Sequence, residues 1–482
     1  MSPLPANRGR TTRGRARANA ARVWEQARAA PPLLRTTDHG EPVLIKREIV
    51  APEIRDDRWI EPFVAANEDT MLRLGLSQDV RSDAHGLQFR LVPGSRLGAL
   101  PLRSATTRRV VAGLLVEPRF DWASVGRVLA HVRFRVEPDV GGAALVPGSA
   151  REVPPWILAG PVLARLSALL RHLARRFEMV TEQRDRPRGG VDWNDYARHS
   201  IPQGSWQRFR CTFPDLRDDG HLISAMRWTT ARLRQDLERA SDTPIGRVLL
   251  DEALTILHRL GPGSHERPQP GLFLAGDALR STWLQAGWEA MAWVSEERGL
   301  GGERNLDGLP WTLASETLWE AWVETILDDV ALRLGARVAA GRRGNTVRAF
   351  AWSRPPRTIG HLAPDFVIEL PGHTVFVDAK YKPHLEDAAR IGWDRVATAA
   401  RDAHRADVHQ ALAYASLSDQ PRVDTVLAYP VPYGADLPFT TAELPAGNRL
   451  VRLMLLGLPF GFEGPGQRDR TLGAVENALR VA

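Results

Sequence analysis

The stretch HLAPDFVIELPGHTVFVDAKYK, His361–Lys382, holds two of the three lysines in this chain of 482 residues. Lysine and arginine together number 64, so the other 61 positive side chains are arginines. The Pro-Gly-His turn at 371–373 separates two apolar runs and predicts a β-hairpin. Because side chains alternate along a strand, Asp378 and Lys380 should share a face, with Asp365 nearby at the start of the partner strand.

This set of side chains suits the hydrolysis of a phosphodiester bond. Asp365 and Asp378 would hold Mg²⁺ through their oxygens, and Mn²⁺ could substitute for it. The ion would lower the pKa of a bound water and neutralise charge on the phosphate. Lys380 would assist that water, because a buried ammonium can lose its proton and a guanidinium effectively never does. Lys382 is expected to touch the DNA backbone. The alternative is an exposed hairpin with an ordinary Asp–Lys pair.

A helix predicted from Ser315 to a stop at Gly335 offers a further acid. At 100 degrees per residue, Glu320 falls at the edge of its apolar arc and could lean into the site as a metal ligand. Glu324 is expected to turn further outward, and either acid could simply be solvated. The arc consists of Leu318, Trp319, Trp322, Val323, Ile326, Leu327, Val330 and Leu334.

A later predicted helix carries Gln410 and Tyr414, which lie four residues apart and therefore share a face. A Gln-x-x-x-Tyr pair has no specific meaning alone. After Asp-x-Lys, the pair is expected to orient the lysine or to contact a DNA strand.

Composition indicates a soluble protein of several domains. Apolar residues make up 43% of the chain and charged residues 25%, and no run approaches the roughly 18 apolar residues of a membrane span. The single cysteine, Cys211, excludes internal disulfides and cysteine-based zinc sites, which fits a reducing bacterial cytoplasm, and it should be buried. The net charge of +7 permits a polyanionic partner without requiring one.

Changes of pattern along the chain divide it into four parts. Residues 1–36 contain eight arginines and one acid and are expected to form a basic disordered tail, although an arm on nucleic acid or a transit peptide would look similar. Residues 37–150 read as a β-rich domain. Residues 151–305 read as mostly helical, including the run from Ile157 to Val180. Residues 306–482 alternate helices and strands, which predicts an α/β domain around a mixed sheet.

Five histidines flank the hairpin motif. His361, His373, His384, His404 and His409 are expected at the surface or beside DNA. A metal site formed by histidines is an alternative, but no His-x-x-x-His pair with a third ligand is evident.

The pieces PDFVIEL, VFVDAKYK and HQALAY resemble the PD-(D/E)xK nuclease superfamily, and in detail the McrC-like nuclease subunits of McrBC modification-dependent restriction systems. The resemblance implies that Asp365 and Asp378 bind metal, that Lys380 is catalytic and that Glu320 is the helix acid. Weaker similarity extends upstream, through Leu114–Val132, Arg175–Trp193 and Arg210–Leu233, while the family does not explain residues 1–80.

The resemblance also implies partners. McrC-like subunits cut double-stranded DNA together with a McrB-like AAA+ ring that hydrolyses GTP, or ATP, and they dock on the ring through their N-terminal part. None of the three lysines lies in a Gly-x-x-x-x-Gly-Lys-Ser/Thr loop, so this chain is not expected to be the motor itself. Two alternatives stay open, a non-catalytic adaptor that activates a ring NTPase and a stand-alone DNA repair nuclease.

Overall fold

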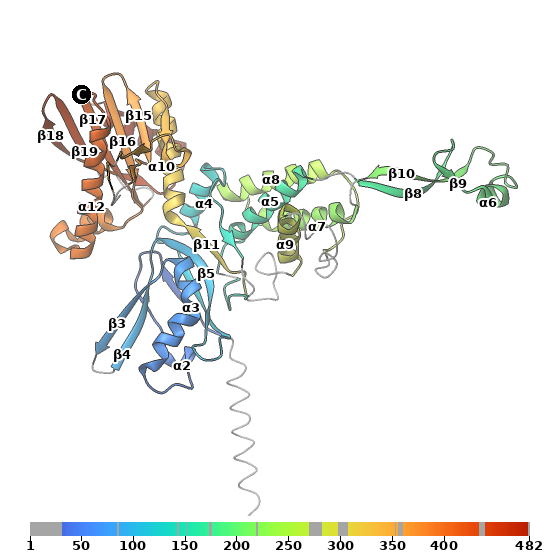
Figure 1. Ribbon diagram of the computed structural model, residues 1–482, viewed down its shortest axis with the longest axis horizontal. Helices are drawn as coiled ribbons and strands as arrows, with labels where there is room; N and C mark the ends of the chain where they lie inside the picture. The colour runs from blue at the N-terminus through green and yellow to red at the C-terminus, as the bar shows by residue number, and fades with distance from the viewer. Residues whose placement is uncertain are drawn as a thin grey trace, which may run out of the picture. The chain divides into compact units, whose positions relative to one another are not determined.

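The computed structural model describes residues 31–83, 86–141, 144–150, 152–172, 176–217, 220–268, 282–296, 307–351, 353–354, 360–432 and 439–480. Among these residues, no helix is both long enough and apolar enough to cross a membrane. The chain divides into two compact units, of which the first comprises the described parts of Met1–Arg119, Gly141–Val153 and Leu306–Ser315. The predicted mixed α+β architecture is confirmed (Figure 1).

The first unit is a pair of sheets with one long helix. Strands β1, β6, β5 and β11 lie side by side in that order, and β2, β4 and β3 form a second sheet. Helix α3 buries Phe63, Met71 and Leu74 at helical spacing against the core. The elements are β1 (Leu33–Thr37), β2 (Val43–Leu44), α2 (Arg47–Val50), η1 (Asp57–Trp59), α3 (Ile60–Leu74), β3 (Ser77–Asp83), β4 (Gly86–Val92), β5 (Arg96–Arg103), β6 (Val110–Glu117) and β11 (Trp311–Ala314).

Two predicted boundaries are wrong in this unit. The tail predicted over residues 1–36 lies largely outside the described residues, and its predicted end is wrong because Leu33 begins a strand that pairs in parallel with β6. Residues 306–315 were expected in the C-terminal domain, but Trp311 pairs with Ala99 across β11 and β5. The sheet that it joins determines the position of such a short strand, so the sequence of the strand alone does not predict it.

The middle of the chain, in the second unit, is helical as predicted, with one exception. Residues 176–180 were expected to continue a helix, but β8 pairs with β10 over nine residues, Thr181 facing Thr212, to form a hairpin (Figure 1). Cys211 on β10 is buried, as predicted. The elements are α4 (Trp122–His131), β7 (Asp139–Val140), α5 (Pro155–Arg171), β8 (Arg176–Arg184), β9 (Gly190–Val191), α6 (Trp193–Asp195), η2 (Tyr196–Ser200), β10 (Phe209–Arg217), α7 (Gly220–Arg239), α8 (Pro244–Leu260) and α9 (Thr282–Ser295).

The C-terminal α/β region, residues 315–480, contains the predicted mixed sheet. Its six strands lie in the order β12-β15-β16-β17-β19-β18, with β16, β17 and β19 parallel and the others antiparallel. The elements are α10 (Ser315–Arg333), β12 (Val338–Ala340), η5 (Gly341–Arg343), β13 (Arg348–Ala349), β14 (His361–Leu362), β15 (Phe366–Leu370), β16 (His373–Ala379), α11 (His384–Ile391), η6 (Trp393–Arg395), α12 (Thr398–Tyr414), η7 (Ala415–Leu417), β17 (Arg422–Val431), β18 (Phe439–Ala446), β19 (Arg449–Pro459) and α13 (Pro465–Arg480).

Two helices fix this sheet. Helix α12 packs over it through Ala411 and Tyr414, which join clusters with residues of β16, β17 and β19 (Figure 1). Helix α10 is tied to the carboxyl ends of β17 and β19, because Trp319 Nε1 donates to the Ala428 carbonyl at 3.2 Å and Trp322 Nε1 donates to the Pro459 carbonyl at 2.8 Å. The indoles therefore hold α10 at the same end of the sheet as Asp378.

A buried ion cluster stabilises the opposite end of the sheet. Asp424 on β17 is fully buried, and its carboxylate lies 2.6 Å from Arg452 Nη2 and 2.9 Å from His373 Nε2. Burial alone would raise the pKa of Asp424, but hydrogen bonds from His373 and Arg452 lower it below its ordinary value. His373, expected at the surface, is thus part of the interior.

Replacing Asp424 by Asn should lower the free energy of unfolding by about 3–5 kcal/mol, because the buried guanidinium of Arg452 would lose the carboxylate that balances its charge. Urea unfolding of the full chain, followed by circular dichroism, would measure the change. The matched control is Asp402→Asn, whose partner Arg405 is exposed, and it should change the free energy by about 1 kcal/mol at most. Equal midpoints for the two variants would contradict the prediction.

Candidate active site

The β15–β16 hairpin brings the two predicted aspartates together. Phe366 pairs with Val377 in an antiparallel register, which places Asp365, one residue earlier, opposite Asp378. Asp365 Oδ2 accepts a hydrogen bond from the Ala379 backbone amide at 2.8 Å. One-residue slippage would turn Asp378 to the other face of the sheet, so the register decides whether the site exists.

Two further hydrogen bonds fix the backbone immediately before β15. Gly341 N donates to the Asp365 carbonyl at 2.7 Å, and Thr346 Oγ1 donates to the Pro364 carbonyl at 2.6 Å. Together with the Ala379 amide, these bonds fix both the main chain and the carboxylate of Asp365. The aspartate is therefore positioned before any ligand binds.

Lys380 follows β16 and points to the carboxylates. Its backbone amide donates to the Ala428 carbonyl at 2.8 Å, and its Nζ lies 2.8 Å from Asp378 Oδ2. Burial would lower the pKa of Lys380, but Asp378, Asp407 and Asp365 together raise it above its ordinary value. These carboxylates favour the charged form of Lys380, which is opposite to the effect expected from burial alone.

Glu320 on α10 interacts electrostatically with the hairpin aspartates. It is half-buried, next to the anchored Trp319. Burial raises the pKa of Glu320; Arg342 opposes this, while Glu324 and Asp378 raise the pKa further. Glu320 is therefore within electrostatic reach of Asp378.

The carboxylates are too crowded to be ionised together without a cation. Burial, then Asp378, then Glu320 raise the pKa of Asp365 far above its ordinary value, against a smaller opposing effect of the Ala379 amide. A proton or a metal ion must relieve this repulsion. Clustered carboxylate oxygens are the ligands that Mg²⁺ and Mn²⁺ prefer, so the donor set fits the predicted ion.

The predicted Gln-x-x-x-Tyr pair lies beside the lysine. Gln410 Oε1 accepts from Lys380 Nζ at 3.1 Å, while Gln410 Nε2 donates to the Tyr414 hydroxyl at 2.6 Å. Tyr414 is buried, and its hydroxyl donates to the Ala363 carbonyl at 3.3 Å. The three side chains form one chain of hydrogen bonds, which ties α12 to Lys380 and to the segment before Asp365.

Asp407 belongs to this site and was missed by the sequence reasoning. Both of its oxygens accept from Lys382 Nζ at 2.7 Å, and Oδ1 lies 4.0 Å from Lys380 Nζ. Lys382 is one-third exposed and held by this carboxylate. Asp407 lies three residues before Gln410, so helical spacing could have placed it on the same face.

Glu324 was expected to point outward, and this is wrong. Its side chain is only 1% exposed and is surrounded by three guanidinium groups. Arg343 Nη2 lies 3.0 Å away, Arg135 Nη1 lies 3.4 Å away, and Arg342 also contacts the carboxylate. A helix acid of this kind becomes buried only when segments far apart in sequence supply the counter-charges, which the periodicity of α10 could not predict.

The histidines divide into two groups. His361 and His409 are exposed, as predicted. His384 is only 3% exposed, against expectation, and burial, followed by His404 and Lys382, lowers its pKa to about 4. His404 is half-buried, and its Nδ1 lies 3.1 Å from the Tyr429 hydroxyl.

Comparisons with known proteins find likeness only at the level of structure. No protein-family model and no curated protein matches the chain. A chain of the half-complex from a tetradecameric assembly of Thermococcus gammatolerans McrB AAA+ hexamers with bound McrC is 13% identical, with a TM-score of 0.42, over 92% of this chain and all of its own length. A chain of the Thermococcus gammatolerans McrBC complex is 13% identical, with a TM-score of 0.26, over 64% of this chain and 89% of its own.

Replacing Asp365 by Asn should stabilise the metal-free protein at high pH. Because the pKa of Asp365 is raised in the folded state, the wild type loses stability as pH rises through that pKa, and Asn removes the loss. The gain should be about 1–2 kcal/mol at pH 9 and should vanish near pH 5. Urea unfolding with a chelator at both pH values measures it.

Glu369→Gln, on the exposed face of β15, is the matched control and should show no such pH-dependent gain. A destabilised Asp365→Asn protein at pH 9 would mean that the carboxylates do not repel one another.

Proposed function

We propose that this chain is a Mg²⁺-dependent DNA endonuclease with a PD-(D/E)xK type of active site. The observation that carries the proposal is the convergence of Asp365, Asp378 and Lys380 at one end of the sheet, with Glu320 in electrostatic reach. An acid–acid–lysine set on a hairpin, backed by a helix acid, provides the ligands and the cation that metal-assisted phosphodiester hydrolysis requires.

Each side chain has a distinct role in this proposal. Asp365, Asp378 and Glu320 would hold the ion, which supplies a water of lowered pKa and neutralises charge on the phosphate. Asp378 and Gln410 keep the Lys380 ammonium beside these carboxylates. Since the pKa of Lys380 is raised, the lysine would act as a cation that binds the attacking water or a phosphate oxygen.

The proposed substrate is double-stranded DNA, and the proposed partner is a McrB-like AAA+ ring that uses GTP or ATP. The nuclease motifs, which resemble those of McrC-like subunits, support this assignment. The three arginines that contact Glu324 add positive charge near the site, and Arg342 lies in electrostatic reach of Glu320. Positive charge beside a phosphodiesterase site favours a polyanionic substrate.

Asp378→Asn and Lys380→Arg should each reduce DNA cleavage by about 10²–10⁴-fold, because one removes a metal ligand and the other replaces a compact ammonium with a broad guanidinium. Cleavage is measured with the full chain, Mg²⁺ and a McrB-like AAA+ protein, on modified and unmodified DNA. Glu369→Gln on the same hairpin should cleave like the wild type. Full cleavage by either site variant would refute the site.

Mg²⁺ binding separates the nuclease from an adaptor that uses the fold only as a scaffold. Calorimetry should find Mg²⁺ binding that strengthens as pH rises from 6 to 9, because the proton held by Asp365 must leave before the ion enters. Asp378→Asn should weaken this binding. A chain that binds neither Mg²⁺ nor Mn²⁺ and yet activates a ring NTPase would be an adaptor.

A further inference from the structure

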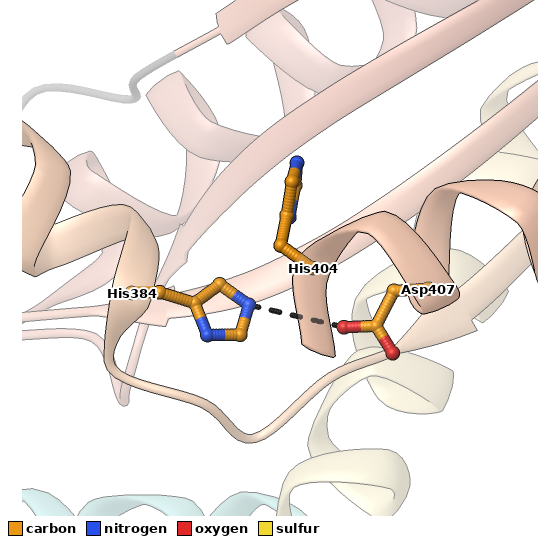
Figure 2. Close-up of side chains that lie close together, drawn as sticks. All are labelled: His384, His404 and Asp407. Atoms are coloured by element: carbon orange, nitrogen blue, oxygen red, sulfur yellow. Dashed lines mark ion pairs between the residues drawn. The ribbon is translucent and has the colours of Figure 1, made fainter. Parts of the chain in front are cut away.

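Helices α11 and α12 place a second group of potential ligands outside the acid–acid–lysine set. His384 is the first residue of α11, while His404 and Asp407 lie three residues apart on α12. One ligand atom from each of the three side chains lies within 4.8 Å of the others. Figure 2 shows the His384 ring directed toward the Asp407 carboxylate, with His404 beside it.

The interior of this cluster is polar and incompletely satisfied. His384 and Asp407 are 3% and 5% exposed. His384 Nε2 has no hydrogen-bond partner among the described residues, and it faces Asp407 Oδ2 at 3.8 Å, which is too long for a hydrogen bond. A buried imidazole nitrogen without a partner is costly, so a ligand that it can bind would be stabilising.

The surroundings suit an ion. The Tyr429 hydroxyl lies 3.1 Å from His404 Nδ1 and fixes the orientation of that ring, as outer groups do around metal-binding histidines. A cavity of about 400 Å³, lined by Trp393, Asp402, His404 and Val408 among others, opens beside His404. Arg401 and Arg405 also line it, whereas His384 and Asp407 do not, so the cavity offers room for a water beside His404 only.

We propose that His384, His404 and Asp407 bind a transition-metal cation of the Zn²⁺ type, at a site separate from the nuclease carboxylates. Two imidazoles and one carboxylate, with a fourth position open to water, are a common ligand set for Zn²⁺. Mg²⁺ prefers oxygen ligands and would favour Asp365 and Asp378 instead. The ion would link the first turn of α11 to the middle of α12.

Lys382 connects this site with the nuclease site. Its ammonium bonds to both oxygens of Asp407, so it competes with a metal ion for that carboxylate. A carboxylate offers about four lone-pair positions, so Oδ2 can bind an ion while Oδ1 keeps the lysine. Repulsion between the two cations should weaken metal binding, and removing the Lys382 charge should strengthen it.

Titration of the untagged full chain with Co²⁺, as a coloured probe for Zn²⁺, tests the proposal. It is performed in the Asp378→Asn background, so that a failure of the nuclease proposal does not affect the result. We expect one Co²⁺ per chain with visible absorption typical of low coordination numbers, displaced by one Zn²⁺. His404→Ala and His384→Asn should each weaken binding by more than about tenfold, and Lys382→Met should tighten it.

The exposed His409 on α12 provides the matched control, and His409→Ala should bind Co²⁺ like its parent. Circular dichroism of each metal-free variant checks folding. Because His404 is only half-buried, His404→Ala decides the question if His384→Asn does not fold. The proposal is overturned if no saturable Co²⁺ or Zn²⁺ binding occurs, or if binding survives His404→Ala unchanged. Unchanged or weaker binding by Lys382→Met would refute the competition.

Discussion

Repulsion among buried carboxylates is the constraint on which the C-terminal region depends. The hairpin register sets Asp365 opposite Asp378, and the indole of Trp319 holds the helix that carries Glu320 at the same end of the sheet. Because backbone hydrogen bonds fix these positions, the acids cannot move apart to relieve the repulsion. Positive charge, whether from a proton, from Lys380 or from a metal ion, would relieve it.

Positive charge is supplied in an ordered way around these acids. Lys380 contacts Asp378 and Gln410, whereas Lys382 donates to Asp407. The two ammonium groups therefore pair mainly with different carboxylates. Asp407 also faces His384, so one carboxylate lies between the two lysines and the histidine cluster. A change of charge at either site would therefore alter the electrostatic environment of the other site through Asp407.

Local pattern was sufficient for much of the fold. Alternating apolar residues around a Pro-Gly turn predicted the β15–β16 hairpin, and 3.6-residue periodicity predicted α10 and α12. Pattern failed where pairing depends on a distant partner. Residues 176–180 join a hairpin with β10, and the short β11 joins β5, which lies more than two hundred positions earlier. Strand pairing of this kind is decided by the partner as much as by the strand itself.

The sequence by itself determined that Asp365, Asp378 and Lys380 could meet, because a hairpin turn and strand alternation are local properties. Only the tertiary structure decided which other polar groups became buried. Glu324 is enclosed because Arg135, 189 positions earlier, reaches it, and His384 is enclosed because α12 covers it. Burial and pKa depend on the neighbours that folding brings together, so no local pattern on α10 or α11 could have predicted them.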